Sequence, residues 1–305
     1  MASTQPPSGW SFGDSRLCAI DLECHCRNQS FQEFQQGIER AERRVTEIGL
    51  ASFDPRRIRL DHAGERGVNA WPFIKARNYA IKEHRHIVGK NHPVWCKTGN
   101  ANDFDFGETR WVNKAGIKKT IIQQIRTFLG DRDAKTPYRN KREVIFLFFD
   151  DRNDCDWLQS LGIDLSKELQ NPRIIDIQDG SLADRIAYRL GRDKISASNI
   201  MSYLRFATSH CHNGGSDAVY ELRAFIAEQT LKDSNGNTYI PDIRTHPQLD
   251  IDGKPVVAHR AAPFESLNAP QLESDEVEMT QVPSDEPGRE LPANKGPWGD
   301  LADYL

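Results

Sequence analysis

The chain has 305 residues, of which 38% are hydrophobic and 28% charged, a composition typical of a globular protein with one large or two small domains. No run approaches 18 consecutive apolar residues, which excludes a membrane-spanning helix, and the N-terminal segment lacks the pattern of a secretory signal. Its six cysteines are few for this length, so we expect reduced thiols and an intracellular protein, cytoplasmic or nuclear.

Charge is distributed unevenly along the chain. Residues 264–305 contain ten acidic residues against two basic ones. Because the whole chain carries −4 and this segment −8, the preceding 263 residues carry +4. The acidic segment has too few apolar residues to offset the entropy of ordering, so we expect it to be disordered. Within its last residues, Trp298, Leu301 and Leu305 would share one side of a short helix, which predicts a docking motif for a protein partner or for the chain's own domain.

The pattern of apolar residues predicts the secondary structure in chain order. Three apolar runs are predicted strands: Leu17–Glu23, Val45–Phe53 and Val144–Phe149. Ile58–His62 is predicted to be a hairpin partner of the second run, because Asp54-Pro55 between them is a turn signal. Helical spacing predicts five helices, over Ile117–Leu129, Asp154–Leu161, Ser181–Leu190, Ala197–Phe206 and Ser216–Leu231.

Strands early in the chain and helices later indicate an α/β or α+β domain over residues 14–232. We expect residues 1–13 to be an N-terminal tail and residues 233–263 to be a partly ordered extension.

Two acidic residues end the first predicted strand. Asp21 and Glu23 are separated by one residue, so on a strand both carboxylates point to the same face. Two adjacent like charges are costly unless a cation lies between them, and hard divalent cations bind carboxylate oxygens. An exposed acidic strand end is the alternative interpretation.

Acidic residues also follow the apolar strand at 144–149. In Asp154-Cys155-Asp156, the residues Leu158 and Leu161 lie four and seven positions after Asp154, which places Asp154 on the helix edge that faces the core. Asp156 lies on a more polar edge. We favour Asp154 as the functional acid over Asp156, and a simple helix cap is the alternative.

A third group of polar residues precedes the last predicted helix. His212-Asn213-Gly214-Gly215-Ser216-Asp217 combines a histidine with an acid five residues later, and the glycines allow a sharp bend between them. By itself this segment is also typical of a capped helix with a surface histidine. The order of the three motifs along the chain is more informative than any one of them.

Taken together, these motifs resemble the DEDDh group of ribonuclease H-like 3′–5′ exonucleases over about residues 15–231. Asp21 and Glu23 match its first motif, Thr46–Gly49 its second-strand signature, Asp154 its second motif, and His212 and Asp217 its third. Where relatives usually carry a Gly-His-Asn-like sequence, this chain reads Phe148–Asp151, so the choice between Asp154 and Asp156 stays open.

Within the group, the chain is most similar to the fungal branch related to the yeast factor called "good for full activity" of the mRNA-export helicase. The segments that carry this similarity, besides the motifs, are Glu83–Ile87, Phe104–Thr109, Leu158–Gly162 and Ile174–Asp179.

The resemblance implies a mixed five-stranded sheet flanked by helices, and a metal-dependent 3′–5′ exonuclease acting on RNA or DNA. Asp21, Glu23, Asp154 and Asp217 would bind two Mg²⁺ or Mn²⁺ ions, with Asp21 bridging them, and His212 would be the general base. A nuclease fold that only binds nucleic acid, or an adaptor acting through its acidic tail, is the alternative, and a ribonuclease H-like endonuclease is a third.

Overall fold

The computed structural model of the protein describes residues 9–25, 44–86, 100–129, 142–169, 172–232 and 247–256. The acidic segment 264–305, with Trp298, Leu301 and Leu305, lies outside the described residues, as does most of the extension at 233–263. Among the described residues, none belongs to a helix that is both long and apolar enough to span a membrane.

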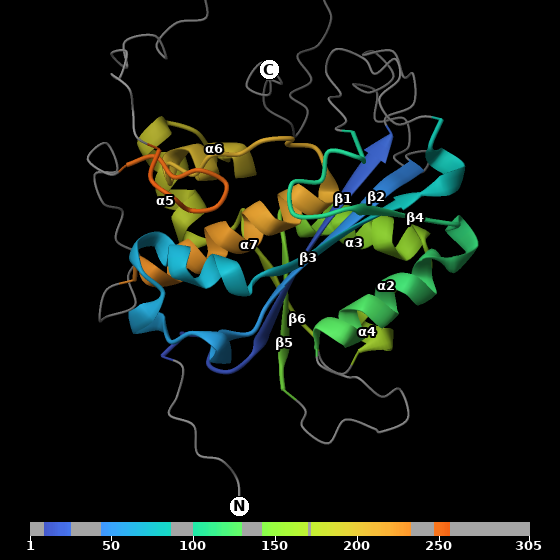
Figure 1. Cartoon of the computed structure of the whole chain (residues 1–305), viewed down its shortest axis with the longest axis horizontal. Helices are drawn as coiled ribbons and strands as arrows, with labels where there is room; N and C mark the ends of the chain where they lie inside the picture. The colour runs from blue at the N-terminus through green and yellow to red at the C-terminus, as the bar shows by residue number, and fades with distance from the viewer. Residues whose placement is uncertain are drawn as a thin grey trace, which may run out of the picture. The chain divides into compact units, whose positions relative to one another are not determined.

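A six-stranded mixed sheet forms the centre of the described region (Figure 1). Its strands are β1 (Arg16–His25), β2 (Arg44–Phe53), β3 (Lys75–Ile81), β4 (Thr109–Val112), β5 (Val144–Phe148) and β6 (Arg173–Asp176). Their spatial order is β4-β3-β2-β1-β5-β6. The strand β2 runs antiparallel to β1 and β3, and the other neighbouring pairs are parallel.

The expected count of five strands is therefore one too low, and the predicted hairpin at Ile58–His62 is wrong. Residues 55–57 and 60–62 form short 3₁₀ turns, the first of them capped by Asp54, which accepts a hydrogen bond from the backbone N–H of Arg56. The antiparallel partner of β2 is β3, whose sequence KARNYAI was missed because two charged residues and an asparagine interrupt its apolar pattern.

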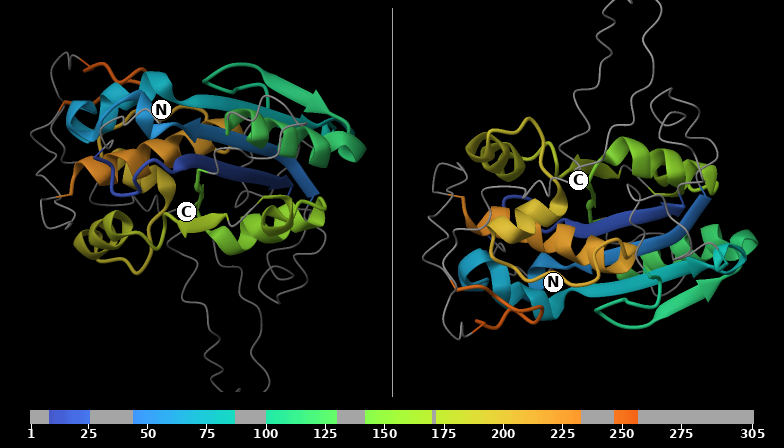
Figure 2. Two further views of the ribbon diagram at one scale, coloured as in Figure 1. Left: turned by 90° about the horizontal axis from the view of Figure 1, so that it is seen from below. Right: turned by 90° about the horizontal axis from the view of Figure 1, so that it is seen from above.

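Helices cover both faces of the sheet (Figure 2). Helices α2 (Lys114–Phe128), α3 (Asp151–Ser160) and α4 (Leu165–Glu168) pack on one face with Cys18, Ile20 and Leu22 of β1. The other face, with Leu17 and Ala19 of β1, packs against α7 (Gly214–Thr230). On the far side of α7 lie α5 (Ser181–Leu190) and α6 (Ala197–Tyr203), so α7 is buried on nearly all sides.

The helix ends follow local chemistry. The last helix begins at Gly214, two residues before the predicted start, because the side chain of Asn213 caps it by accepting a hydrogen bond from the backbone N–H of Ser216. Helix α6 ends at Tyr203, and Arg205 after it has a left-handed backbone with φ 56°.

Packing extends beyond the expected domain limits of 14 and 232. Trp10 is buried, contacts Phe53 edge-on and donates a hydrogen bond through Nε1 to the carbonyl oxygen of Ile58. On the C-terminal side, Leu249 is buried and forms a β-bridge with Phe206. Segments on both sides of residues 14–232 thus contribute to the core.

Candidate metal centre and active site

The first two acids lie on the face of β1 that packs against α7. In the register of β1 with β2, Asp21 is opposite Gly49 and Glu23 is opposite Glu47. The parallel partner β5 pairs with β1 only as far as Ala19, so Asp21 and Glu23 extend past the end of β5. Their carboxylates therefore lie at an open end of the sheet, on the same face, as the two-residue spacing predicts.

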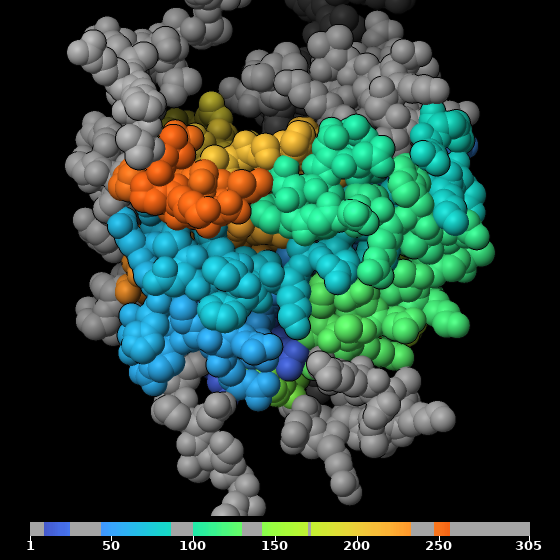
Figure 3. All heavy atoms as spheres, in the orientation of Figure 1, coloured from blue at the N-terminus to red at the C-terminus, as the bar shows by residue number. Residues whose placement is uncertain are grey.

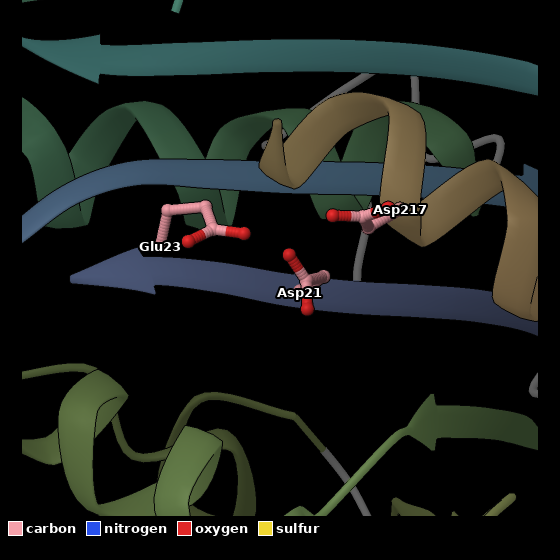
Figure 4. A group of neighbouring side chains, drawn as sticks. All are labelled: Asp21, Glu23 and Asp217. Atoms are coloured by element: carbon pink, nitrogen blue, oxygen red, sulfur yellow. The ribbon is translucent and has the colours of Figure 1, made fainter. Parts of the chain in front are cut away.

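Asp217 reaches these carboxylates because the start of α7 packs unusually close to β2. A Cβ atom on Gly49 would lie 1.8 Å from the carbonyl oxygen of Gly214, and one on Gly215 would lie 2.6 Å from Cβ of Asn78. Glycine at both positions removes these clashes. The first turn of α7 consequently brings one oxygen each of Asp21, Glu23 and Asp217 within 4.8 Å of one another (Figure 4).

Asp154 approaches the same cluster from the opposite side of β1. It is 3% exposed, and burial followed by the charge of Asp21 raises its pKa, whereas the nearby backbone N–H of Leu22 lowers it. Asp156 is exposed. Of the two candidate acids after β5, the structure brings Asp154 to Asp21.

The start of α3 is fixed by a second acid. Asp150 has a left-handed backbone with φ 71°. The backbone N–H groups of Asp150 and Asp151 donate to the carboxylate of Asp176, at 3.3 and 3.2 Å. This carboxylate, at the end of β6, holds the turn that carries Asp154 into the cluster.

His212 lies at the rim of the cluster. Its side chain is 52% exposed, and Nδ1 lies 3.9 Å from Oε1 of Glu23. Its backbone N–H donates to Oδ2 of Asp217 at 2.8 Å, which ties the histidine to the start of α7. All five residues predicted from the sequence are thus brought together at one end of the sheet.

Burial and mutual repulsion raise the pKa of every acid in the cluster. Burial is the largest cause for both Asp21 and Asp154. The charges of neighbouring carboxylates raise both pKa values further, that of Asp217 for Asp21 and that of Asp21 for Asp154. For Asp217, burial followed by the nearby Glu47 and Asp105 raises the pKa to about 7. Oδ2 of Asp21 and Oδ2 of Asp154 are buried and lack a hydrogen-bond partner within the described ranges.

One further carboxylate was missed by the sequence analysis. Glu221 lies one helical turn after Asp217, is 2% exposed, and its Oε2 atom also lacks a hydrogen-bond partner in the described part of the chain. Burial and then Asp21 and Asp154 raise its pKa well above the usual range. The four-residue spacing from Asp217 places both acids on one side of the helix, but the sequence does not otherwise distinguish Glu221 from an ordinary helix residue.

Glu47 supports the centre from β2. It is 1% exposed and accepts hydrogen bonds at Oε2 from Nδ2 of Asn78 at 2.9 Å and from Nδ2 of Asn213 at 3.1 Å. Burial raises its pKa to about 7, against the lowering effect of Asn78 and of the backbone of Gly214. Because Asn213 caps α7, this contact holds the helix start against the sheet.

The donor set fits a hard divalent cation. All of the clustered ligand atoms of Asp21, Glu23 and Asp217 are carboxylate oxygens, and the buried unpartnered oxygens of Asp21 and Asp154 need a positive charge or a proton. Among the described residues, Cys18, Cys155 and Cys211 are free thiols.

Comparisons with known proteins agree with this geometry. The family model for the DNA polymerase III subunit epsilon-like C-terminal domain of the DEDDh group matches residues 16–228, more than half of the chain. A search of curated protein sequences finds no significant match.

Two solved structures are similar to this chain. One is cell-death related nuclease 4 (CRN-4), with 15% identity and a TM-score of 0.35, covering 70% of this chain and 62% of that protein. The other is the RNase domain of the yeast Pop2 protein, with 11% identity and a TM-score of 0.36, covering 72% of this chain and 80% of that one. The chain thus spans less than two thirds of the first structure. On the family match, with its motif residues gathered at one end of the sheet, the chain belongs to the DEDDh nuclease family.

Proposed function

We propose that this protein is a metal-dependent 3′–5′ exonuclease that hydrolyses phosphodiester bonds of RNA or DNA. The observation that carries the proposal is the convergence of Asp21, Glu23 and Asp217 within 4.8 Å, with Asp154 buried beside Asp21, in a chain of the DEDDh family.

Asp21, Glu23, Asp154 and Asp217 would hold two Mg²⁺ or Mn²⁺ ions. Such ions supply charge stabilisation for the attacking and leaving oxygens of the phosphodiester when bound. The protein's part is to present an all-oxygen ligand set on rigid elements: β1 fixes two carboxylates, α7 fixes the third and α3 the fourth. Magnesium and manganese both favour such ligands.

His212 would accept the proton of the attacking water at a ring nitrogen. Its imidazole is half-exposed beside Glu23, where substrate and solvent reach it, and its backbone is fixed by Asp217. Imidazole exchanges protons around neutral pH, which suits this role.

We also propose that the chain belongs to the fungal branch related to the yeast "good for full activity" factor. It is supported by the segments Glu83–Ile87, Phe104–Thr109 and Ile174–Asp179. The proposed 3′–5′ activity implies that the substrate is a nucleic acid with a free 3′ end.

A degradation assay tests the proposal. Single-stranded RNA and DNA, labelled at the 5′ end or at the 3′ end, are incubated with the full-length protein in Mg²⁺, Mn²⁺ or EDTA. A 3′–5′ exonuclease shortens the 5′-labelled strand progressively and releases the 3′ label at once as a mononucleotide. Both products should form in Mg²⁺ or Mn²⁺ and not in EDTA. Asp21→Asn should abolish both products, keep the fold, and slightly raise the melting temperature of the cation-free protein by relieving repulsion.

Two results would contradict the proposal. Full activity of Asp21→Asn excludes the carboxylate site as the catalytic centre. Absence of any shortening by the wild-type protein, together with no rise of its melting temperature in Mn²⁺, supports the adaptor function instead.

A further inference from the structure

The segment that leads into α7 carries a second histidine, two residues before His212. Nδ1 of His210 lies 2.6 Å from Oδ1 of Asp105. The side chain of His210 is 53% exposed, whereas that of Asp105 is 7% exposed. A carboxylate buried beneath a half-exposed imidazole fixes the orientation of the ring and leaves Nε2 turned away from the acid.

Asp105 is itself held by α7. Its Oδ2 accepts a hydrogen bond from the hydroxyl of Tyr220 at 2.8 Å, and its backbone N–H donates to Oγ of Ser216 at 3.2 Å. The hydroxyl oxygen of Tyr220 accepts from the backbone N–H of Ser209 at 3.0 Å. In Figure 3, the green segment that begins at residue 100 adjoins the gold loop before α7 on the visible surface. The helix that carries Asp217 thus also sets the position of His210.

His210 lies at the rim of the proposed active site. Two residues of chain span at most about 7 Å, so His210 lies within that distance of His212, measured between Cα atoms. The backbone N–H of His212 is in turn 2.8 Å from Oδ2 of Asp217. A polynucleotide whose reacting phosphodiester lies over the carboxylates would therefore pass its neighbouring phosphates close to His210.

The surroundings of His210 favour its charged form. The hydrogen bond that His210 donates to Asp105, followed by the charge of that acid, raises the pKa of His210, and Asp103 adds to the effect. Within the described ranges, Tyr220 of α7 also contacts Asp105, and Cys211, Asp217 and Arg223 lie close enough to Asp105 to feel its charge. At the edge of a cluster of carboxylates, which repels phosphate, a fixed cation attracts it.

We propose that His210, held by Asp105, is a phosphate-binding residue that contacts the substrate backbone beside the scissile phosphodiester. The inference rests on the proposed function, because it requires a nucleic acid bound over the carboxylates. A charged N–H donor binds a phosphate oxygen regardless of the base, so this contact would contribute to affinity and register and not to sequence preference.

Single-turnover kinetics on the full-length protein test the contact, with a 5′-fluorescein-labelled single-stranded RNA and Mn²⁺. His210→Gln removes the charge and His210→Lys keeps one. His62→Gln is the matched control, since His62 is an exposed histidine after β2, and the Phe53 end of β2 lies opposite Leu17, away from Glu23.

His210→Gln should raise the half-saturating protein concentration about 3- to 10-fold with little change in the maximal rate, and should lower the slope of log affinity against log salt by about 0.7 for one lost phosphate contact. His210→Lys should restore most of the affinity, and His62→Gln should match wild type. Unchanged half-saturation and salt slope in His210→Gln would overturn the inference. A lower maximal rate at unchanged half-saturation would also overturn it, because Asp105 and His210 would then only position His212.

Fluorescence anisotropy with the same RNA in buffer without divalent cation separates this inference from the proposed function. Wild-type protein that binds RNA in this buffer but does not cleave it after Mn²⁺ is added contradicts the exonuclease proposal alone, and His210→Gln should still weaken that binding. Equal binding by wild type and His210→Gln contradicts the phosphate contact alone.

Discussion

Five carboxylates share the end of the sheet at the candidate centre: Asp21, Glu23, Asp154, Asp217 and Glu221. Burial raises the pKa of each, and the neighbouring acids raise it further. Such a group of acids is unfavourable unless cations or protons neutralise it. These carboxylates therefore concentrate negative charge when they are ionised, and this charge is what makes the site a candidate for binding cations.

The two acids after β5 should differ sharply in their contribution to activity. Asp154→Ala removes a buried carboxylate beside Asp21 and should lower the rate by orders of magnitude, whereas Asp156→Ala removes an exposed one and should have little effect. Rates on a labelled oligonucleotide with Mn²⁺ measure both variants. The opposite result would show that Asp156, and not Asp154, is the functional acid.

The histidine at the rim should affect the chemical step more than binding. His212→Ala should lower the maximal rate by about 10²- to 10⁴-fold, the usual contribution of a general base, with a smaller change in the half-saturating concentration. The fall of the wild-type rate at acidic pH should be lost in the variant. An unchanged pH–rate profile would show that another group accepts the proton.

At the scale of elements, the approach of α7 to β2 determines whether Asp217 reaches β1. The contact leaves no room for a side chain at Gly49, since a Cβ there would lie 1.8 Å from Gly214 O. Gly49→Ala should therefore lower the free energy of unfolding by about 1–3 kcal/mol through overpacking. The substitution should also lower activity, because it displaces α7 and with it Asp217.

Gly116→Ala is the matched control, and a urea titration measures the free energy of unfolding of both variants. Gly116 lies in α2, and a Cβ there would meet only Cγ1 of Val112, at an ordinary 3.8 Å. The substitution should be neutral or stabilise the protein by up to about 1 kcal/mol, because alanine favours helix over glycine. Equal destabilisation by both substitutions would contradict the importance of the α7–β2 approach.

At the scale of the whole molecule, the centre should make the cation-free protein less stable as pH rises. Glu47 and Asp217 have pKa values of about 7 in the folded protein, above the ordinary values of 4.5 and 3.8 expected in the unfolded chain. Between about pH 4 and 7 the folded state consequently holds more protons, so stability falls as pH rises through this window. The melting temperature in EDTA should fall by several degrees.

Divalent cations should reverse this trend, because they bind the ionised carboxylates of the folded state. At pH 7.5, Mn²⁺ should raise the melting temperature more than at pH 5. Glu221→Gln should raise the melting temperature in EDTA at pH 7.5, since it removes a buried carboxylate with an unpartnered oxygen. A melting temperature that is independent of pH in EDTA would contradict this account of the centre.

Several strands and site residues could be predicted from local sequence patterns. The apolar runs predicted β1, β2 and β5 because a strand covered on both faces, or alternating in polarity, has a distinctive sequence. The spacing of Asp21 and Glu23 placed both on one face because side chains alternate along a strand. The leucines after Asp154 placed it toward the core because helical periodicity is also local.

The remaining strands and the other members of the site follow from the tertiary fold, because they depend on contacts between residues far apart in the chain. The strands β3, β4 and β6 are short or interrupted by polar residues such as Asn78, whose polarity is satisfied by Glu47 across the sheet. Glu221 appears in sequence as an ordinary helix residue, and its place among the carboxylates follows from the packing of α7 between the sheet and α5 and α6. The pairing of His210 with Asp105 joins segments about a hundred residues apart, a contact that no local pattern encodes.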